Sequence, residues 1–283
     1  MKSELFMHKM NDILIDIQKQ APVDTKYRAG RWHRDRATFR GLWVEMKVYG
    51  KSLISPQNKD VKKFLIIGRA RSGTTLLSKL LDAHNQIECN GEVLHSMVLR
   101  PTDHLNRLAM KSKSSIYGAK LLSYQMVQVH RLQDPIGFLK QLNYKGFKLI
   151  YIRRSTFAQT LSLDIAQMTK AFHNNGDMEK KQSSFYIDPQ DFLRRIIWSD
   201  MLLQYEQYIF NDIPHFTISY EQDLMGEANQ HKMLHCLFEY LDVEPEITSS
   251  KLKKMLSSDP REVIKNYDQI ANTLQTAGYG HLL

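Results

Sequence analysis

The sequence predicts an α/β fold of three layers, in which helices cover both faces of a central, mainly parallel sheet. Two observations predict it: a short apolar run that ends at a glycine and leads directly into a helical pattern, and the repetition of this alternation along the chain. Uninterrupted apolar runs are typical of strands that are buried on both faces. Because strands alternate with helices, neighbouring strands should run parallel.

The elements follow from local patterns. Strands are predicted at residues 62–68, 115–122, 147–154 and 215–220. Helices are predicted at residues 74–83, 134–142, 156–170, 189–210 and 231–241, with a helical tail over 259–274. The helix over 189–210 has the clearest signal, because Leu193, Ile197 and Met201 recur at a spacing of four. A further helix is expected before residue 21, where Met10, Leu14 and Ile17 share one face.

Composition divides the chain into an N-terminal basic and aromatic extension, residues 1–60, and one main domain, residues 61–283. Residues 1–63 hold 14 Lys and Arg against 7 Asp and Glu, which is most of the formal net charge of +9, so the remainder is close to neutral. That distribution argues against a nucleic-acid groove. Two cysteines and the absence of a signal-peptide or membrane-spanning pattern favour a reducing, cytoplasmic location.

The strongest functional signal is a loop between a strand and a helix, in FLIIGRARSGTTLLSKLL. Gly68 and Gly73 allow the backbone to turn tightly around a phosphate, and the following helix directs its N-terminal amides and dipole at the same anion. The residues expected to bind this anion are Arg69, Arg71, Ser72, Gly73, Thr74 and Thr75.

The loop differs from a nucleotide triphosphatase loop, GxxxxGK[ST], at one decisive position. Thr74 stands where the lysine belongs, and the cation is instead Arg71. A P-loop kinase or NTPase is therefore poorly supported, although it remains an alternative function.

The loop resembles the 5′-phosphosulfate loop of sulfotransferases that use 3′-phosphoadenosine-5′-phosphosulfate (PAPS). That family binds the 3′-phosphate of its donor with an Arg at a strand end and a Ser eight residues later. Arg154 and Ser162 have this spacing, with Arg153 as the competing arginine. The segments CNGEVLH, IYGAKLLSYQ, RRSTFAQTLSL and ISYEQDL are most similar to bacterial carbohydrate sulfotransferases, of the trehalose and Nod-factor type.

The resemblance implies a P-loop-like fold, PAPS as co-substrate, no required metal, and a carbohydrate or glycolipid acceptor. It also implies a catalytic base at Glu92, since the trehalose type has a glutamate at this distance from the loop. Glu88, His95 and His130 are the competing bases. Arg71 would stabilise the departing phosphate.

Several basic residues have weaker assignments. Lys120, at the end of a predicted strand, could contact the donor sulfate or the acceptor, or could lie at the sheet edge without a role in binding. Lys253, Lys254 and Arg261 are expected to form a solvated face. A catalytically inactive PAPS-binding relative is a further alternative function.

Residues 26–51 combine five aromatic rings with eight basic side chains. The favoured interpretation is that the rings pack on the core while the charges remain solvated. The alternatives are an acceptor platform, contact with an anionic membrane surface, or the interface of a homodimer.

Overall fold

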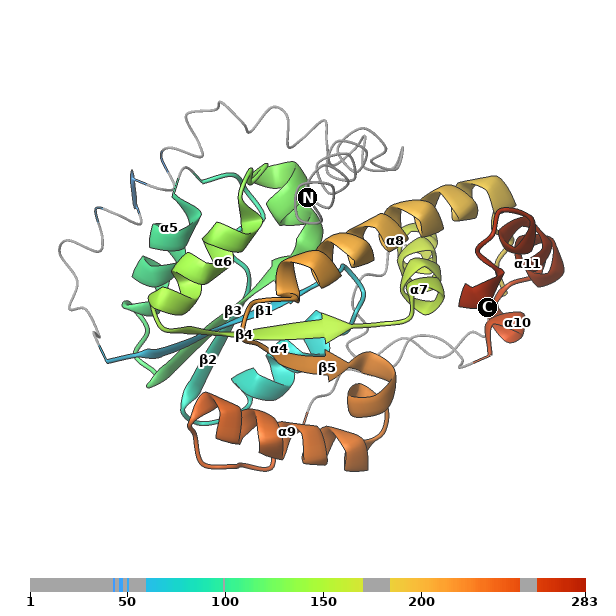
Figure 1. Ribbon diagram of the computed structural model, residues 1–283. Helices are drawn as coiled ribbons and strands as arrows, with labels where there is room; N and C mark the ends of the chain where they lie inside the picture. The colour runs from blue at the N-terminus through green and yellow to red at the C-terminus, as the bar shows by residue number, and fades with distance from the viewer. Residues whose placement is uncertain are drawn as a thin grey trace.

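The computed structural model describes residues 60–98, 100–169, 184–249 and 259–283, together with Trp43, Met46, Lys47 and Gly50. Its centre is a five-stranded sheet in the order β2-β3-β1-β4-β5, and every neighbouring pair is parallel (Figure 1). The strands are β1 (Lys62–Gly68), β2 (Ile87–Glu92), β3 (Ile116–Leu122), β4 (Phe147–Arg153) and β5 (Phe216–Ser219). The predicted fold class, a three-layer, P-loop-like α/β fold, is confirmed.

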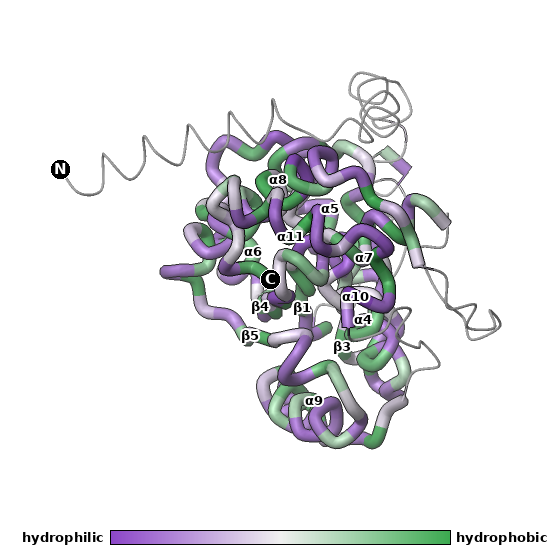
Figure 2. The backbone as a smooth tube through the Cα atoms, turned by 90° about the vertical axis from the view of Figure 1, so that its right-hand side faces the viewer, coloured by the Kyte–Doolittle hydropathy of each residue, from purple (hydrophilic) through white to green (hydrophobic). Residues whose placement is uncertain are grey.

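Helices cover both faces of this sheet (Figure 1). Alternate residues of β1 supply the two cores: Leu65 and Ile67 pack with α5, α6 and α8, whereas Phe64 and Ile66 pack with α4 and α9. In Figure 2, α9 mixes hydrophobic and hydrophilic stretches along its turns, as expected of a helix with one buried face. The helices are α4 (Thr74–Asp82), α5 (Pro101–Ala109), α6 (Pro135–Tyr144), α8 (Pro189–Phe210) and α9 (Glu227–Leu241).

A third apolar cluster lies beside the sheet, where α7 and the outer end of α8 meet the tail (Figure 1). The tail forms two short helices instead of the single helix predicted over 259–274. The interruption has a backbone cause, because Phe185 donates to Val263 and accepts from Lys265. These elements are α7 (Thr156–Thr169), α10 (Pro260–Val263) and α11 (Tyr267–Thr276).

Among the strands and α-helices that the structure describes in the main domain, β2 and α5 were not predicted. The sequence of β2, IECNGE, contains polar residues and a glycine and lacks the apolar run of a buried strand. Two single turns of π-helix, Gln125–Val129 and Tyr220–Leu224, also follow strands β3 and β5. π-Helical turns are rare in proteins, and those that occur are often found at functional sites.

The N-terminal segment is largely outside the described residues, and so are the predicted opening helix, Lys170, Lys253 and Lys254. Within residues 26–51, Trp43 is 50% exposed, and the Lys47 ammonium lies 3.4 Å from the centre of its ring. This ring is therefore half-exposed, and the packing of the other four rings on the core stays a prediction.

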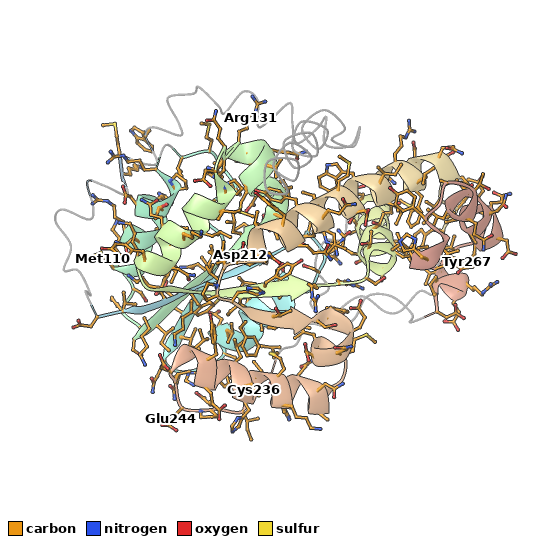
Figure 3. All side chains as sticks on the ribbon, in the orientation of Figure 1. Met110, Arg131, Asp212, Cys236, Glu244 and Tyr267 are labelled. Carbon is orange, nitrogen blue, oxygen red and sulfur yellow. The ribbon has the colours of Figure 1, made fainter. Side chains whose placement is uncertain are left out.

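The two cysteines do not form a disulfide. Cys89 is a buried free thiol, and Cys236 is a free thiol exposed on α9 (Figure 3). Among the described residues, no helix has both the length and the apolar character needed to cross a membrane.

Candidate anion-binding and catalytic site

The loop between β1 and α4 has a conformation that depends on its glycines. Gly73 has a φ of 100°, and a Cβ there would lie 2.6 Å from the ring of Tyr220. A Cβ on Gly68 would lie 2.8 Å from the carbonyl oxygen of Ile152. Arg71, between them, also has a positive φ of 65°. Both glycines are therefore required by close contacts, and Arg71 is held in a backbone conformation that is costly for a side-chain-bearing residue.

Ser72 closes the turn of this loop. Its hydroxyl donates to the carbonyl of Arg69 at 2.6 Å, and its side chain is buried. No side chain among the described residues caps the N-terminus of α4, where Gly73 is the N-cap. The first amides of α4 therefore lack a side-chain acceptor, which is the arrangement that binds anions at helix N-termini.

Arg69 lies behind the loop and is 1% exposed. Its guanidinium donates to the hydroxyl of Ser199 at 2.8 Å and to the carbonyl of Arg154 at 2.6 Å, and its Nε lies 3.6 Å from the Glu206 carboxylate. The sequence prediction counted Arg69 among the cofactor ligands. Because its side chain is occupied inside the protein, Arg69 supports the loop, and we do not retain it as a ligand.

A second support was missed by the sequence prediction. Gln159 of α7 donates from Nε2 to the carbonyl of Ala70 at 2.6 Å and accepts from the hydroxyl of Ser199 at 2.6 Å. It is the Gln of the FAQ segment, which was noted only as part of a resemblance. Helix α7 thus holds Ala70 through Gln159, and helix α8 holds Arg69 through Ser199.

The structure brings Arg71, Arg154 and Ser162 together. Arg71 donates from Nε to the Ser162 hydroxyl at 3.2 Å, and Arg154 donates from Nη1 to the Arg71 carbonyl at 2.7 Å. The Arg154 guanidinium also stacks on the ring of Tyr220, 4.1 Å from its centre. Arg153, the competing arginine, is exposed at the end of β4. The two predicted anion sites are therefore adjacent.

The two guanidinium groups are electrostatically unfavourable neighbours. Burial lowers the pKa of Arg71, and the charge of Arg154 lowers it further. Burial also lowers the pKa of Arg154, while Tyr220 and Glu221 oppose that shift. A bound anion between the two arginines would relieve their mutual repulsion, which makes this part of the loop a favourable place for phosphate groups.

Glu92, the predicted base, lies at the end of β2 and faces β3. A bulge between Cys89 and Glu92 places one extra residue in β2, and as a result Glu92 pairs with Lys120. The Lys120 ammonium lies 3.3 Å from Oε1 of Glu92 and donates to the Thr75 hydroxyl at 2.8 Å. Lys120 thus links the predicted base to the first turn of α4, directly after the loop.

The competing bases have other surroundings. Glu88, at the other end of β2, accepts hydrogen bonds from Ser112 and Asn90. His95 is exposed, and its Nδ1 lies 3.0 Å from the Glu92 carbonyl. His130 is partly buried, its Nε2 lies 3.0 Å from the Leu94 carbonyl, and desolvation lowers its pKa. Of these four groups, only Glu92 has a described contact with Lys120.

The tail cation that the structure describes lies elsewhere. Arg261 pairs with Asp268 at 3.3 Å and stacks on the ring of Tyr267, which is labelled in Figure 3 beside α10. This agrees with the expectation of a solvated charged face for that residue.

One part of the chain matches a known family. Residues 64–134 match the family described as "Sulfotransferase family". This stretch contains the loop, Glu92 and Lys120. Among solved structures, the chain is similar to mouse sulfotransferase SULT7A1 complexed with PAP, with 16% identity and a TM-score of 0.46 over 83% of this chain and 87% of that chain. No curated protein matches the sequence.

Proposed function

We propose that this chain is a sulfotransferase that moves a sulfuryl group from PAPS to a hydroxyl of a carbohydrate or glycolipid acceptor. The observation that carries the proposal is the convergence of Arg71, Arg154 and Ser162 beside an uncapped helix N-terminus. The match of residues 64–134 to the sulfotransferase family supports it independently.

The donor carries two phosphate-bearing ends, which suits two adjacent cationic groups. The amides at the start of α4 and the Arg71 side chain would bind the 5′-phosphosulfate, and Arg154 with Ser162 would bind the 3′-phosphate. A guanidinium offers paired donors to phosphate oxygens. The contact of Arg71 with Ser162 at 3.2 Å supports one ligand bound across both groups.

The transfer itself needs an acceptor oxygen in line with sulfur and a group that takes its proton. The acceptor oxygen forms a bond to sulfur, the bond between sulfur and the 5′-phosphate oxygen breaks, and the electron pair remains on that phosphate. Arg71 and the loop amides would stabilise the charge that develops there. Glu92 would accept the hydroxyl proton, a contribution typically worth about 10²–10⁴-fold in rate.

The same geometry gives little support for transfer from ATP. Thr74 occupies the position of the phosphate-binding lysine and is buried. The ammonium near the start of α4 comes instead from Lys120, which is shared with Glu92. Lys120 therefore lies between Glu92, which would remove the acceptor proton, and the start of α4, where the donor phosphosulfate would bind.

Calorimetric titration with 3′-phosphoadenosine 5′-phosphate (PAP), beside ATP with Mg²⁺, tests the donor site. We expect micromolar binding of PAP and none of ATP. The reverse preference would replace the sulfotransferase proposal by a kinase-like function. PAP binding without any transfer would instead favour the inactive PAPS-binding relative.

Transfer from labelled PAPS to trehalose, glucose, octyl glucoside and 2-naphthol tests the acceptor class. The saccharide acceptor rests on the resemblance of the segments around Glu92 and Lys120 to bacterial carbohydrate sulfotransferases. We expect product with a saccharide or with octyl glucoside, which represents a glycolipid. Product with 2-naphthol alone would overturn the carbohydrate assignment and leave the sulfotransferase assignment in place.

A homodimer and a membrane contact through residues 26–51 are further proposals for this enzyme. Light scattering with size-exclusion chromatography measures the first. Sedimentation with vesicles containing anionic lipid measures the second, and deletion of residues 1–59 should abolish it while leaving PAP binding intact.

A further inference from the structure

Gln125 is a buried polar residue that the mechanism above does not use. It is the first residue of the π-helical turn that follows β3, and its side chain is fully buried. Its Nε2 donates to Oε2 of Glu92 at 2.9 Å, and its Oε1 accepts from the backbone N–H of Leu122 at 2.9 Å. Buried amides are normally satisfied at both ends, and Gln125 is satisfied by one backbone group and the predicted base.

The orientation of this amide follows from its neighbours. A backbone N–H can only donate, so the atom of Gln125 that faces Leu122 must be the oxygen. The atom that faces Glu92 must then be the nitrogen, which donates to the carboxylate. The backbone N–H of Leu122, at the end of β3, therefore orients the Gln125 amide so that its N–H group points at Glu92.

The two oxygens of Glu92 consequently have different partners. Oε1 lies beside Lys120, which is anchored on Thr75, and Oε2 accepts from Gln125, which is anchored on Leu122. The Glu92 side chain is 31% exposed at the end of β2. With Lys120 alone, the carboxylate could rotate about its contact with the ammonium, whereas two anchored partners fix both oxygens.

We propose that Gln125 is a positioning residue for sulfuryl transfer, which holds the Glu92 carboxylate in the orientation required to take the acceptor proton. This inference rests on the proposed function. Proton transfer depends steeply on geometry, and a base that is free to rotate loses rate even when substrate binding is unchanged. Gln125 therefore acts on turnover through Glu92 and not on donor affinity.

The test uses two variants: Gln125→Glu, which keeps an oxygen for Leu122 and places a second carboxyl group against Glu92, and Gln125→Met, which removes the donor to Glu92 without adding a titratable group. We expect kcat to fall about tenfold or more, with the Kd for PAP and the KM for PAPS within about twofold of wild type. Transfer is measured with the acceptor that the wild type sulfates. Gln141→Glu is the control for the same substitution at an exposed position, because Gln141 accepts a hydrogen bond from Thr102 through its Oε1 and has no described contact with Glu92.

The same substitution in a Glu92→Gln background separates positioning from a general structural effect. If Gln125 acts through Glu92, Gln125→Glu should change kcat by less than about twofold there. A drop as large as in the wild-type background, or an unchanged kcat in the single variant, would overturn the inference. If Gln125→Glu does not fold, Gln125→Met alone decides the question in both backgrounds.

Failure of the inference and failure of the proposed function give different results. Wild-type protein that binds no PAP and transfers no sulfuryl group would overturn the proposed function and this inference together. Wild-type protein that binds PAP and transfers the group, with a Gln125→Glu variant of equal kcat, would overturn the inference alone.

Discussion

The Nε atom of Arg71 donates a hydrogen bond to the hydroxyl of Ser162 at 3.2 Å, which joins the loop after β1 to the second turn of α7. Arg154 completes the unit by donating to the Arg71 carbonyl at 2.7 Å. A change in any of these three residues should therefore alter how the other two are placed. We expect the effects of Arg71→Ala and Ser162→Ala on PAP affinity to be non-additive, as is usual for residues in direct contact.

Arg71→Ala should weaken PAP binding by about 10- to 100-fold, because hydrogen bonds to charged groups contribute about 1.5–3 kcal/mol. Calorimetric titration with PAP measures the change. Arg131→Ala is the control, since Arg131 also has a positive φ, of 46°, and its side chain is exposed. Equal losses in the two variants would mean that backbone strain, and not the Arg71 guanidinium, determines PAP affinity.

Glu92→Gln should lower kcat by about 10²–10⁴-fold while PAP affinity stays within a few-fold, because an amide cannot accept the acceptor proton. Its oxygen can still accept from Lys120, whereas its nitrogen then faces the N–H group of Gln125 and that hydrogen bond is lost. Glu88→Gln, on the same strand, should leave kcat unchanged because Glu88 contacts Ser112 and Asn90. If Glu92→Gln retained wild-type turnover and His95→Asn did not, the base would be His95.

The sequence was sufficient to predict strands β1, β3, β4 and β5 and the glycine turn between β1 and α4, since buried strands and glycine turns leave local signals. The strand that presents Glu92 was not predicted, because β2 is short and polar and its pairing with β3 includes a bulge. Glu92 and Lys120 are adjacent only in that register. The family resemblance suggested Glu92, and the position at the end of a predicted strand suggested Lys120, but a bulge is decided by the packing of two strands and has no signature of its own here.

The assignment of Arg69 as a ligand failed for a related reason. Loop sequence alone cannot distinguish an arginine that points toward a ligand from one that points inward. The decisive partners, Ser199 and Glu206, lie on α8, far along the chain. Buried arginines are rare unless they are paired, so a prediction from sequence expects an arginine to be exposed. That expectation is wrong where a carboxylate distant in sequence pairs with the buried guanidinium.

Arg69→Met should destabilise the protein by about 3–5 kcal/mol, because it leaves the Glu206 carboxylate buried without its cation. The remaining donors to Glu206 are the hydroxyls of Ser123 and Tyr151. Urea unfolding at constant m-value measures the change. The double variant Arg69→Met/Glu206→Gln should be less destabilised than the sum of the single variants, and additivity within about 0.5 kcal/mol would show that the two groups do not interact.

The same variant should also have a stronger pH dependence than the wild type, because Arg69 lowers the pKa of Glu206 and its removal leaves the effect of burial unopposed by that charge. Burial raises the pKa of Glu206, so its native state holds a proton at pH values where the unfolded chain has lost it. Stability contributed in this way is present at low pH and is lost as the pH rises. The destabilisation by Arg69→Met should therefore be smaller at pH 5 than at pH 7.5, and the opposite trend would contradict the assignment of Arg69 as the partner of Glu206.

His130 should give the wild-type protein a pH dependence of the opposite sign. Desolvation lowers the pKa of this imidazole from its ordinary value of 6.5, so as the pH falls below 6.5 the unfolded chain takes up a proton that the native ring takes up only at a lower pH. Because the unfolded state then binds more protons, the free energy of unfolding falls as the pH decreases, by at most about 1.4 kcal/mol per pH unit from this group. Urea unfolding at pH 7.5, 6.5 and 5.5 should show a shallower decline for His130→Gln than for the wild type. Equal slopes would mean that the His130 ring takes up protons alike in the native and the unfolded state, and His130 would then return as a candidate base.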